Sequence, residues 1–289
     1  MSLKDTFFSV KQTINCGGTL LDFSTPRIMG ILNITPDSFY DGGIHLTEKN
    51  ILTHVELMLS EGADIIDIGG YSSRPGAEEI PEKEEKARLA AALGPVRKKF
   101  PSAILSIDTF RSGIARYVVE EFGVHMINDI SAGLLDENMI PVVSELRVPY
   151  ILMHMQGTPG NMQKNPTYRE VVKDILAFFT ERISVAKAAG IEDIIVDPGF
   201  GFGKTAHDNF RILHDLKLFG ILGYPLMAGI SRKSMIHRSL NISASEALNG
   251  TTVLNTLALN NGARLLRVHD VREAVEAVKL VSLYQGTVS

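Results

Sequence analysis

Eight short, almost continuously apolar segments recur along the chain, each separated from the next by enough residues to form a helix. Continuous apolar character is typical of parallel strands that are buried on both faces. Strands that alternate with helices form βα units, and eight such units close into a barrel with the helices outside. The segments span residues 27–35, 64–70, 103–109, 125–131, 150–155, 194–199, 224–231 and 264–270.

The stretches between these segments have apolar residues at the spacing of three and four that a helix requires. In the first stretch, for example, Ile51, Val55 and Leu59 would share one face. This alternation predicts an α/β fold, the (β/α)8 TIM barrel, and no change of composition marks a domain boundary, so we expect a single domain over residues 1–289. The predicted helices span residues 46–60, 82–99, 112–122, 137–146, 167–189, 206–218, 243–260 and 271–283.

A β-hairpin is predicted ahead of the barrel, within residues 1–26. Two short stretches, 7–14 and 19–23, flank the sequence Asn15-Cys16-Gly17-Gly18. Glycines supply the positive φ angles that a tight hairpin turn needs. We expect this hairpin to close the bottom of the barrel, which then occupies residues 27–289.

Composition argues against several classes of protein. The chain has 289 residues, of which 45% are hydrophobic and 21% charged, and its net charge of −4 offers no basic surface for nucleic acid. Cys16 is the only cysteine, so no intramolecular disulfide can form. The first residues lack the apolar core of a signal peptide, and no apolar run reaches membrane-spanning length. We therefore expect a cytoplasmic protein with small-molecule partners and neither nucleic acid nor membrane as a partner.

Polar residues stand near the C-terminal ends of the eight strands, where barrel enzymes have their active sites. Arg267 and His269 are two residues apart, so their side chains point to the same face of the last strand. Because arginine can bind a phosphate through two parallel hydrogen bonds, the pair favours an anion site. The structural alternative is that Arg267 pairs with an acid such as Asp270. The strand-end residues are Asn33, Asp67, Asp108, Asn128, His154, Asp197, Ser231 with Lys233, and Arg267 with His269.

The third, fourth and sixth strands end in Asp108, Asn128 and Asp197. Carboxylates accept two N–H bonds side by side, and an amide both donates and accepts, so this set suits the edge of a flat, amino-substituted heterocycle. Two alternatives stay open: a Mg²⁺ site built from these oxygen ligands, and turn formation by the Asp197-Pro198 pair. The candidates to contact the faces of such a ring are Ile130, Met153 and Phe202.

The glycine-rich stretch Gly199-Phe-Gly-Phe-Gly-Lys204 resembles a phosphate-binding loop only superficially, because its spacing differs from that of the P-loop. The glycines are better explained by backbone that passes close to a pocket. Lys233 follows the seventh strand and can neutralise an anion or donate to a heterocycle. Its neighbour Arg232 is expected to be solvated.

Together these segments resemble the dihydropteroate synthase family, in the order of that family's motifs from residue 28 to the last helix. One motif would be weak support, whereas seven in order are highly specific. The matching motifs are Gly30-Ile-Leu-Asn-Ile-Thr-Pro-Asp-Ser-Phe39, Gly62-Ala-Asp-Ile-Ile-Asp-Ile-Gly-Gly70 with Ser73-Arg-Pro-Gly76, Ser106-Ile-Asp-Thr109, Ile127-Asn-Asp-Ile130, Asp197-Pro-Gly-Phe-Gly-Phe-Gly-Lys204, Gly229-Ile-Ser-Arg-Lys-Ser234 and Arg267-Val-His269.

The resemblance implies a transferase of folate biosynthesis, which condenses 6-hydroxymethyl-7,8-dihydropterin diphosphate with p-aminobenzoate to 7,8-dihydropteroate and pyrophosphate. The implied pterin site comprises Asp108, Asn128, Met153, Asp197, Gly229 and Lys233. The implied diphosphate site comprises Asn33, Arg74, Arg267 and His269, with Asn33 also near Mg²⁺. The implied p-aminobenzoate site, which sulfonamides mimic, comprises Ser73, Pro75, Phe202, Lys233 and Ser234.

The chemistry implied by the family is a dissociative substitution at the pterin methylene group, which needs no protein nucleophile. Mg²⁺ and Arg267 would stabilise the departing charge. We expect Asp37 to face the developing positive charge, and the loops 35–43 and 70–76 to exclude water. The residues with implied catalytic roles are Asp37, Arg74, Lys233 and Arg267.

The second of these loops departs from the family pattern Gly-Glu-Ser-Thr-Arg-Pro-Gly at two positions. Tyr71 stands in place of the glutamate and Ser73 in place of the threonine. Serine keeps the hydroxyl group, so the affinity for p-aminobenzoate and sulfonamides is expected to shift only modestly, whereas Tyr71 has no assigned role. Asp67 and His154 are assigned structural roles.

Two other functions are weighed against the synthase. A methyltetrahydrofolate-dependent corrinoid methyltransferase domain shares the barrel, but it would need neither residues 73–76 nor the Arg267 and His269 pair. A non-catalytic pterin-binding homologue would be favoured by loss of Asn33, Arg74 or Lys233, and all three are present. The resemblance also implies a homodimer, for which the predicted helix over residues 243–260 is a candidate interface.

Overall fold

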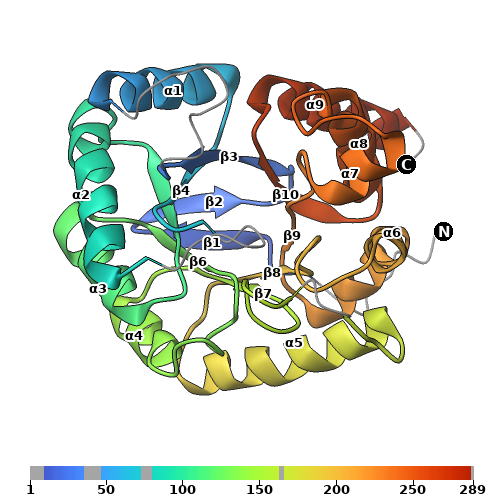
Figure 1. Ribbon diagram of the computed structural model, residues 1–289, viewed down its shortest axis with the longest axis horizontal. Coiled ribbons are helices and arrows are strands. Elements are labelled where there is room, and N and C mark those ends of the chain that lie inside the picture. Colours follow the sequence, from blue (N-terminus) through green and yellow to red (C-terminus); the bar gives the residue numbers. More distant parts are fainter. Residues whose placement is uncertain (1–9, 36–46, 73–79, 163–165, 288–289) are drawn as a thin grey trace.

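A closed ring of eight parallel strands forms the centre of the protein, and helices surround it (Figure 1). The structure is a computed structural model that describes residues 10–35, 47–72, 80–162 and 166–287. The strands follow one another around the ring in chain order, and all neighbours are parallel, so the predicted (β/α)8 barrel is confirmed. The strands are β3 (Arg27–Asn33), β4 (Ile65–Gly69), β5 (Ile104–Asp108), β6 (Met126–Asp129), β7 (Tyr150–Met153), β8 (Ile194–Asp197), β9 (Leu226–Ala228) and β10 (Ala263–Val268).

Apart from α7, the described helices occur where the spacing of apolar residues predicts them, and two match the predicted bounds at both ends. Within the described ranges, every helix is too short or too polar to cross a membrane. The helices are α1 (Glu48–Glu61), α2 (Glu82–Lys99), α3 (Ser112–Phe122), α4 (Met139–Leu146), α5 (Val171–Ala188), α6 (Ala206–His214), α7 (Ser234–Leu240), α8 (Leu248–Asn260) and α9 (Val271–Thr287), with the 3₁₀ helix η2 (Leu216–Leu222) after α6.

Three helical segments differ from the prediction for local reasons. The helix expected over residues 206–218 ends as α6, since the backbone leaves the helical conformation at Asp215 (φ −97°, ψ 13°) and continues as η2. The helix expected from residue 243 begins later, as α8, since Ser243 donates to the Glu246 carboxylate in a separate turn. Helix α7 is not predicted, because its seven residues are too few to show a helical period.

The predicted N-terminal hairpin is present. Strand β1 (Thr13–Cys16) pairs with β2 (Thr19–Asp22) in antiparallel register, and Gly17 and Gly18 form the turn with φ angles of 62° and 94°. Positive φ at both central residues defines a type I′ turn, which glycine adopts without strain. The first strand begins later than expected, and the expected residues before position 10 lie outside the described part of the chain.

The hairpin covers the N-terminal end of the barrel, and Figure 1 shows β1 and β2 lying across its centre. Ile14, Cys16, Leu21 and Phe23 are buried against one apolar side chain from each barrel strand. The hairpin therefore seals this end of the lumen, as predicted. The strand residues, here called the basal layer, are Met29, Ile65, Ile104, Met126, Ile151, Ile195, Met227 and Leu265.

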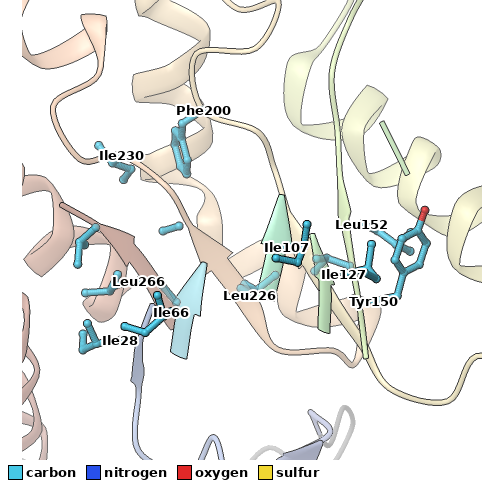
Figure 2. Packing of buried hydrophobic residues seen from close by; sticks show 14 of the residues in the cluster. Ile28, Ile66, Ile107, Ile127, Tyr150, Leu152, Phe200, Leu226, Ile230 and Leu266 are labelled. Carbon is cyan, nitrogen blue, oxygen red and sulfur yellow. The ribbon is translucent and has the colours of Figure 1, made fainter. Parts of the chain in front are cut away.

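The residues between these positions face outward and form the larger hydrophobic cluster under the helices. Figure 2 shows part of this cluster, including Ile28, Ile66 and Leu266 from three strands. Alternate residues of a strand point to opposite faces. The apolar segments are continuous in the sequence because one set of side chains fills the lumen and the other packs under the helices.

Two residues further along several strands, the side chains that point into the lumen change from apolar to polar. Two residues beyond Ile65 stands Asp67, and two residues beyond Met126 stands Asn128. The polar strand ends thus begin directly above the sealed base and are open only toward the C-terminal end of the barrel. The residues at this second level, here called the polar layer, are Ile31, Asp67, Ser106, Asn128, Met153, Asp197, Gly229 and Arg267.

Candidate active site

Arg267 joins two acidic side chains across the polar layer. Its Nε atom donates to Asp67 Oδ2 on β4 at 2.6 Å, and its Nη2 atom donates to Asp108 Oδ2 on β5 at 2.7 Å. Asp67 is fully buried, and only 17% of the arginine side chain is exposed. Because unpaired buried charges are strongly destabilising, the arginine is required by both acids. Arg267 therefore pairs with acids from across the barrel, and not with Asp270.

Asp108 is the titratable member of this cluster. Burial raises the pKa of its carboxyl group to about 7, although the Arg267 charge acts in the opposite direction. The neighbouring Asp67 charge also raises this pKa. Two carboxylates share one guanidinium, so the cluster favours an additional proton or an N–H donor from a ligand at Asp108.

Three buried atoms of the lumen have no hydrogen-bond partner among the described residues: Asp67 Oδ1, Ser106 Oγ and Asn128 Oδ1. They come from the adjacent strands β4, β5 and β6, where Asn128 Nδ2 also donates to Asp67 Oδ2 at 3.1 Å. An unsatisfied buried polar group costs about 1–3 kcal/mol. Three of them in one place indicate that a ligand or water completes their hydrogen bonds.

Asp197 and Lys233 lie beside Gly229 in the same lumen. A Cβ atom on Gly229 would lie 3.7 Å from Lys233 Nζ, 3.8 Å from Asp197 Oδ2 and 3.9 Å from Arg267 Cβ. Asp197 Oδ1 accepts a bond from the Gly199 amide at 2.8 Å, which leaves Oδ2 for the lumen. Burial raises the pKa of Asp197 and lowers that of Lys233 to about 8. The absence of a side chain at Gly229 keeps the space between these groups open.

An apolar cluster borders the polar residues at the mouth of the barrel. It brings together Ile130, Met153 and Phe202, the three residues predicted to contact a flat ring. Thioether and aromatic groups make favourable contacts with ring faces. The remaining members of the cluster are Phe110, Leu135, Met155 and Met162.

The glycine-rich segment 199–204 packs against the residues that follow β7. A Cβ atom on Gly199 would lie 2.0 Å from the His154 carbonyl oxygen, and one on Gly203 would lie 2.4 Å from that of Gln156. Both glycines have positive φ angles. Only glycine permits this approach of two backbone segments. That the segment also passes close to a pocket stays a prediction. Lys204 ends the segment and is buried, a position that the sequence does not indicate.

The loops after β9 and β10 are tied together. Arg232 binds Asp270 through two hydrogen bonds, Nε to Oδ2 at 3.0 Å and Nη2 to Oδ1 at 2.6 Å. Ser231 Oγ lies 3.0 Å from His269 Nδ1. The expectation of a solvated Arg232 is therefore wrong. The tie holds His269 and the loop that carries Lys233 at one side of the mouth.

Two further predicted residues lie at the same rim. The Asn33 amide oxygen would be 3.4 Å from a Cβ atom on Gly69, and Asp108 Cβ would be 3.7 Å from it, so Asn33 and Asp108 border the same point. Ser234 begins α7 directly after Lys233. The predicted site residues that lie outside the described part of the chain are Asp37, Ser73, Arg74 and Pro75.

Sequence reasoning missed Asp67 as a site residue. The signal was the strand period, because Asp67 lies two residues beyond a residue of the basal layer. Tyr71, which had no assigned role, packs edge-on against Phe110 with 5.3 Å between the ring centres, and the Arg111 guanidinium lies 5.6 Å from its ring. No sequence pattern predicts this contact, since the rings follow different strands.

The comparisons with known proteins agree with this geometry. The pterin-binding enzyme family matches residues 29–269. The chain is 42% identical to dihydropteroate synthase of Escherichia coli strain K12, over 91% of this chain and 93% of the relative. Yersinia pestis dihydropteroate synthase, solved with a sulfonamide drug, is 40% identical with a TM-score of 0.90, over 95% of this chain and 99% of that one. Xanthomonas albilineans dihydropteroate synthase, solved with 7,8-dihydropteroate, is 37% identical with a TM-score of 0.84, over 94% and 98%. The chain belongs to the pterin-binding enzyme family.

Proposed function

We propose that this chain is a dihydropteroate synthase, which joins 6-hydroxymethyl-7,8-dihydropterin diphosphate to p-aminobenzoate and releases pyrophosphate. The relatives named above carry this activity in their names. The observation that carries the proposal is the group of three unpartnered lumen atoms next to the Arg267 cluster. A pterin ring offers donors and acceptors along one edge, and such a ring would complete these bonds.

The polar layer, together with Asp108 and Lys233 next to it, is assigned to the pterin ring. Asp108 and Asp197 would accept N–H groups, and Lys233 would donate to a ring carbonyl or nitrogen. Asp67 joins this subsite, since it carries one of the unpartnered oxygens and orients Asn128. The residues assigned from the family motifs are Asp108, Asn128, Met153, Asp197, Gly229 and Lys233.

The rim is assigned to the diphosphate and the amine. Arg267 uses Nε and Nη2 for its two acids, so Nη1 is left for the departing anion. The tie between the β9 and β10 loops holds His269 nearby. The diphosphate residues are Asn33, Arg74, Arg267 and His269. The p-aminobenzoate residues are Ser73, Pro75, Phe202, Lys233 and Ser234.

Mg²⁺ fits this site as an ion that arrives with the diphosphate. The described residues contain no group of three or more His, Cys, Asp or Glu side chains that could hold a metal. Mg²⁺ is commonly bound by one or two protein oxygens together with substrate phosphates. The Asn33 amide oxygen, at the rim beside Asp108, is suited to be such a donor. When bound there, the ion would supply neutralisation of leaving-group charge.

The proposed reaction is dissociative. The bond between the methylene carbon and the diphosphate oxygen breaks first, and its electrons leave with the diphosphate. Arg267 and His269 stabilise that charge, with Arg74 predicted to do the same. The amine nitrogen of p-aminobenzoate then bonds to the methylene cation, next to Lys233, and the resulting ammonium transfers a proton to solvent water. Asp37 is predicted to face the cation.

Pyrophosphate release tests this function. With the pterin diphosphate and Mg²⁺ present, we expect release only after p-aminobenzoate is added. A corrinoid methyltransferase or a non-catalytic pterin-binding protein would release none under these conditions. Calorimetric binding of the pterin without release would select the non-catalytic alternative.

We also propose that the protein is a homodimer. Exposed apolar side chains on α8 and α9, which pack against each other, support an interface there. Light scattering of the purified protein is expected to give twice the chain mass, and Val253→Asp with Leu257→Asp is expected to give monomers. A monomeric parent protein would contradict the proposal. The apolar residues concerned are Val253, Leu257, Leu280, Leu283 and Tyr284, each 45–70% exposed.

A further inference from the structure

Lys204 is a buried cation that the proposed reaction does not use. Only 3% of the residue is exposed. Its Nζ atom lies 2.9 Å from the Gly199 carbonyl oxygen, 3.0 Å from that of Phe202 and 3.2 Å from that of His154. A fourth contact joins it to His154 Nδ1 at 3.0 Å. Lysine is almost never fully buried unless its charge is satisfied, so this arrangement has a specific role.

The four contacts join two different loops of the mouth. Gly199 and Phe202 belong to the turn after β8, whereas His154 follows β7. Two further bonds hold the same segment from outside: Asn209 accepts from the Gly201 amide, and the Tyr168 hydroxyl donates to the Gly203 carbonyl oxygen. Lys204 supplies the contacts that join this turn to His154.

The turn that Lys204 holds also contacts the side chain of Lys233. The Phe200 carbonyl oxygen, between the two bound carbonyls, accepts a bond from Lys233 Nζ at 2.5 Å. The Phe202 ring lies 4.8 Å from the same Nζ atom. A displacement of the turn would therefore move both the Phe202 ring and the Phe200 carbonyl oxygen that accepts from Lys233.

His154 supports the buried ammonium as an acceptor. Burial lowers the pKa of Lys204 to about 7, so the ammonium form prevails below that pH. In that form Lys204 has only donors, so His154 Nδ1 carries a lone pair and the ring proton is on Nε2. Burial and the Lys204 charge lower the pKa of His154 to about 2, which keeps the ring neutral in the working range of pH. The ring is further packed edge-on against Phe178 at 4.8 Å.

We propose that Lys204 is a positioning residue, whose buried ammonium fixes the turn of residues 199–202 against the end of β7 and thereby sets Phe202 and Lys233 for the aromatic amine. This inference rests on the proposed function only for the identity of that substrate. The pterin ring shares Lys233 with the amine, and the Gly199 amide of the turn bonds to Asp197. The other assigned contacts of the ring are on strands that the turn does not carry. The binding of the two substrates should therefore respond differently to loss of Lys204.

Steady-state kinetics of Lys204→Met tests this difference. We expect the KM for p-aminobenzoate to rise at least tenfold, with the KM for the pterin diphosphate within threefold of the parent value. The matched control is Lys187→Met, which removes an exposed lysine from α5 and should change neither constant. An unchanged KM for the amine, or equal rises in both constants, would overturn the proposal.

Two measurements remain informative if Lys204→Met folds poorly. His154→Asn keeps an acceptor near the Nδ1 position and should restore most of the amine affinity that His154→Leu loses; equal losses would contradict the proposed contact. In the parent protein, ¹⁵N NMR should show an unprotonated Nδ1 and a protonated Nε2 at His154 from pH 5 to pH 6, where Lys204 is charged. A protonated Nδ1 would overturn the proposal.

A probe that needs no catalysis separates this proposal from the proposed function. With 4-fluorophenylalanine at position 202, the ¹⁹F resonance of the free protein should shift or broaden in Lys204→Met and remain unchanged in Lys187→Met. A parent protein that releases no pyrophosphate would refute the synthase activity alone. An unchanged ¹⁹F resonance in Lys204→Met would refute the positioning role alone.

Discussion

The two ends of the barrel lumen are built from the same eight strands and have opposite character. At the N-terminal end, the basal layer is apolar in every strand and is sealed by the hairpin. Two residues further along, the polar layer holds a buried ion cluster and three unpartnered polar atoms. Stability and binding are thus separated by position along each strand, because one period of the strand divides the two levels.

The largest effect is expected at Arg267, where stability and binding depend on the same side chain. Arg267 belongs to the binding end, yet its removal leaves Asp67 and Asp108 buried without a counter-charge. We expect Arg267→Met to lower the free energy of unfolding by about 3–5 kcal/mol, measured with urea, and to abolish pyrophosphate release. Adding Asp67→Asn should recover part of the stability. A double variant less stable than Arg267→Met would contradict the proposed dependence.

At the sealed end, a change should affect stability alone. Phe23 is 2% exposed and belongs to the cluster at the base of the lumen. We expect Phe23→Ala to lower the free energy of unfolding by about 3 kcal/mol, while kcat/KM of the folded protein stays within twofold. Leu20→Ala in the same hairpin, at a residue 69% exposed, is the control and should be nearly neutral. A large loss of kcat/KM in Phe23→Ala would show that the two ends are coupled.

At the open end, a conservative change should affect binding alone. Asp197→Asn keeps the acceptor for the Gly199 amide but removes the charge that faces the lumen. Kinetics should show kcat/KM reduced by roughly 100-fold, since a hydrogen bond to a charged group contributes about 1.5–3 kcal/mol. Because burial raises the pKa of Asp197, the neutral amide should leave the melting temperature equal or higher. A marked fall in melting temperature would assign Asp197 to the structural end.

The open end should also make stability depend on pH in an unusual direction. The folded protein holds the pKa of Asp108 at about 7, above the ordinary value of 3.8. The folded state therefore binds more protons than the unfolded state between these values, and its stability falls as pH rises through this window. From pH 5.5 to pH 7 the contribution is about 2 kcal/mol. Urea unfolding of Asp108→Asn should lack this part of the slope, and identical slopes in both proteins would count against the raised pKa.

The smallest effect is expected at Tyr71, where this chain departs from the family pattern. Its edge-on contact with Phe110 lies at the rim, outside the polar layer. An aromatic pair contributes about 0.5–1.5 kcal/mol beyond its buried area, so Tyr71→Leu should lower stability by about 1 kcal/mol. The KM for the pterin diphosphate should not change. A tenfold rise in that constant would instead place Tyr71 in the binding site.

The features that were predictable from the sequence depend on local period. The eight strands, the hairpin turn at Gly17 and Gly18 and the bounds of α2 and α3 all follow from spacing and turn chemistry within one segment. The strand ends also follow, because a parallel barrel places them at one end. The spacing placed these residues at one end of the barrel, and the resemblance to the family motifs then implied a role for each.

What the sequence did not reveal depends on contacts between segments. Arg232 looked solvated because its partner Asp270 follows a different strand, and closure of the barrel brings the two together. Lys204 had no predicted role once the phosphate-loop spacing was rejected, because its acceptors are carbonyl oxygens whose directions are decided only by the folded loops. Asp67 differs from these, since the strand period already placed it in the lumen and the pairing with Arg267 was the missing information.

Cys16, the only thiol of the chain, lies in the hairpin and is fully buried against the basal layer, where burial raises its pKa to about 12. Such a thiol is inert to alkylating reagents until the hairpin lifts away from the barrel. Its rate of modification is consequently a gauge of how often the base opens, readable by mass spectrometry without any introduced label. Substrates that bind at the far end should slow this rate only if opening of the base requires the whole barrel to unfold.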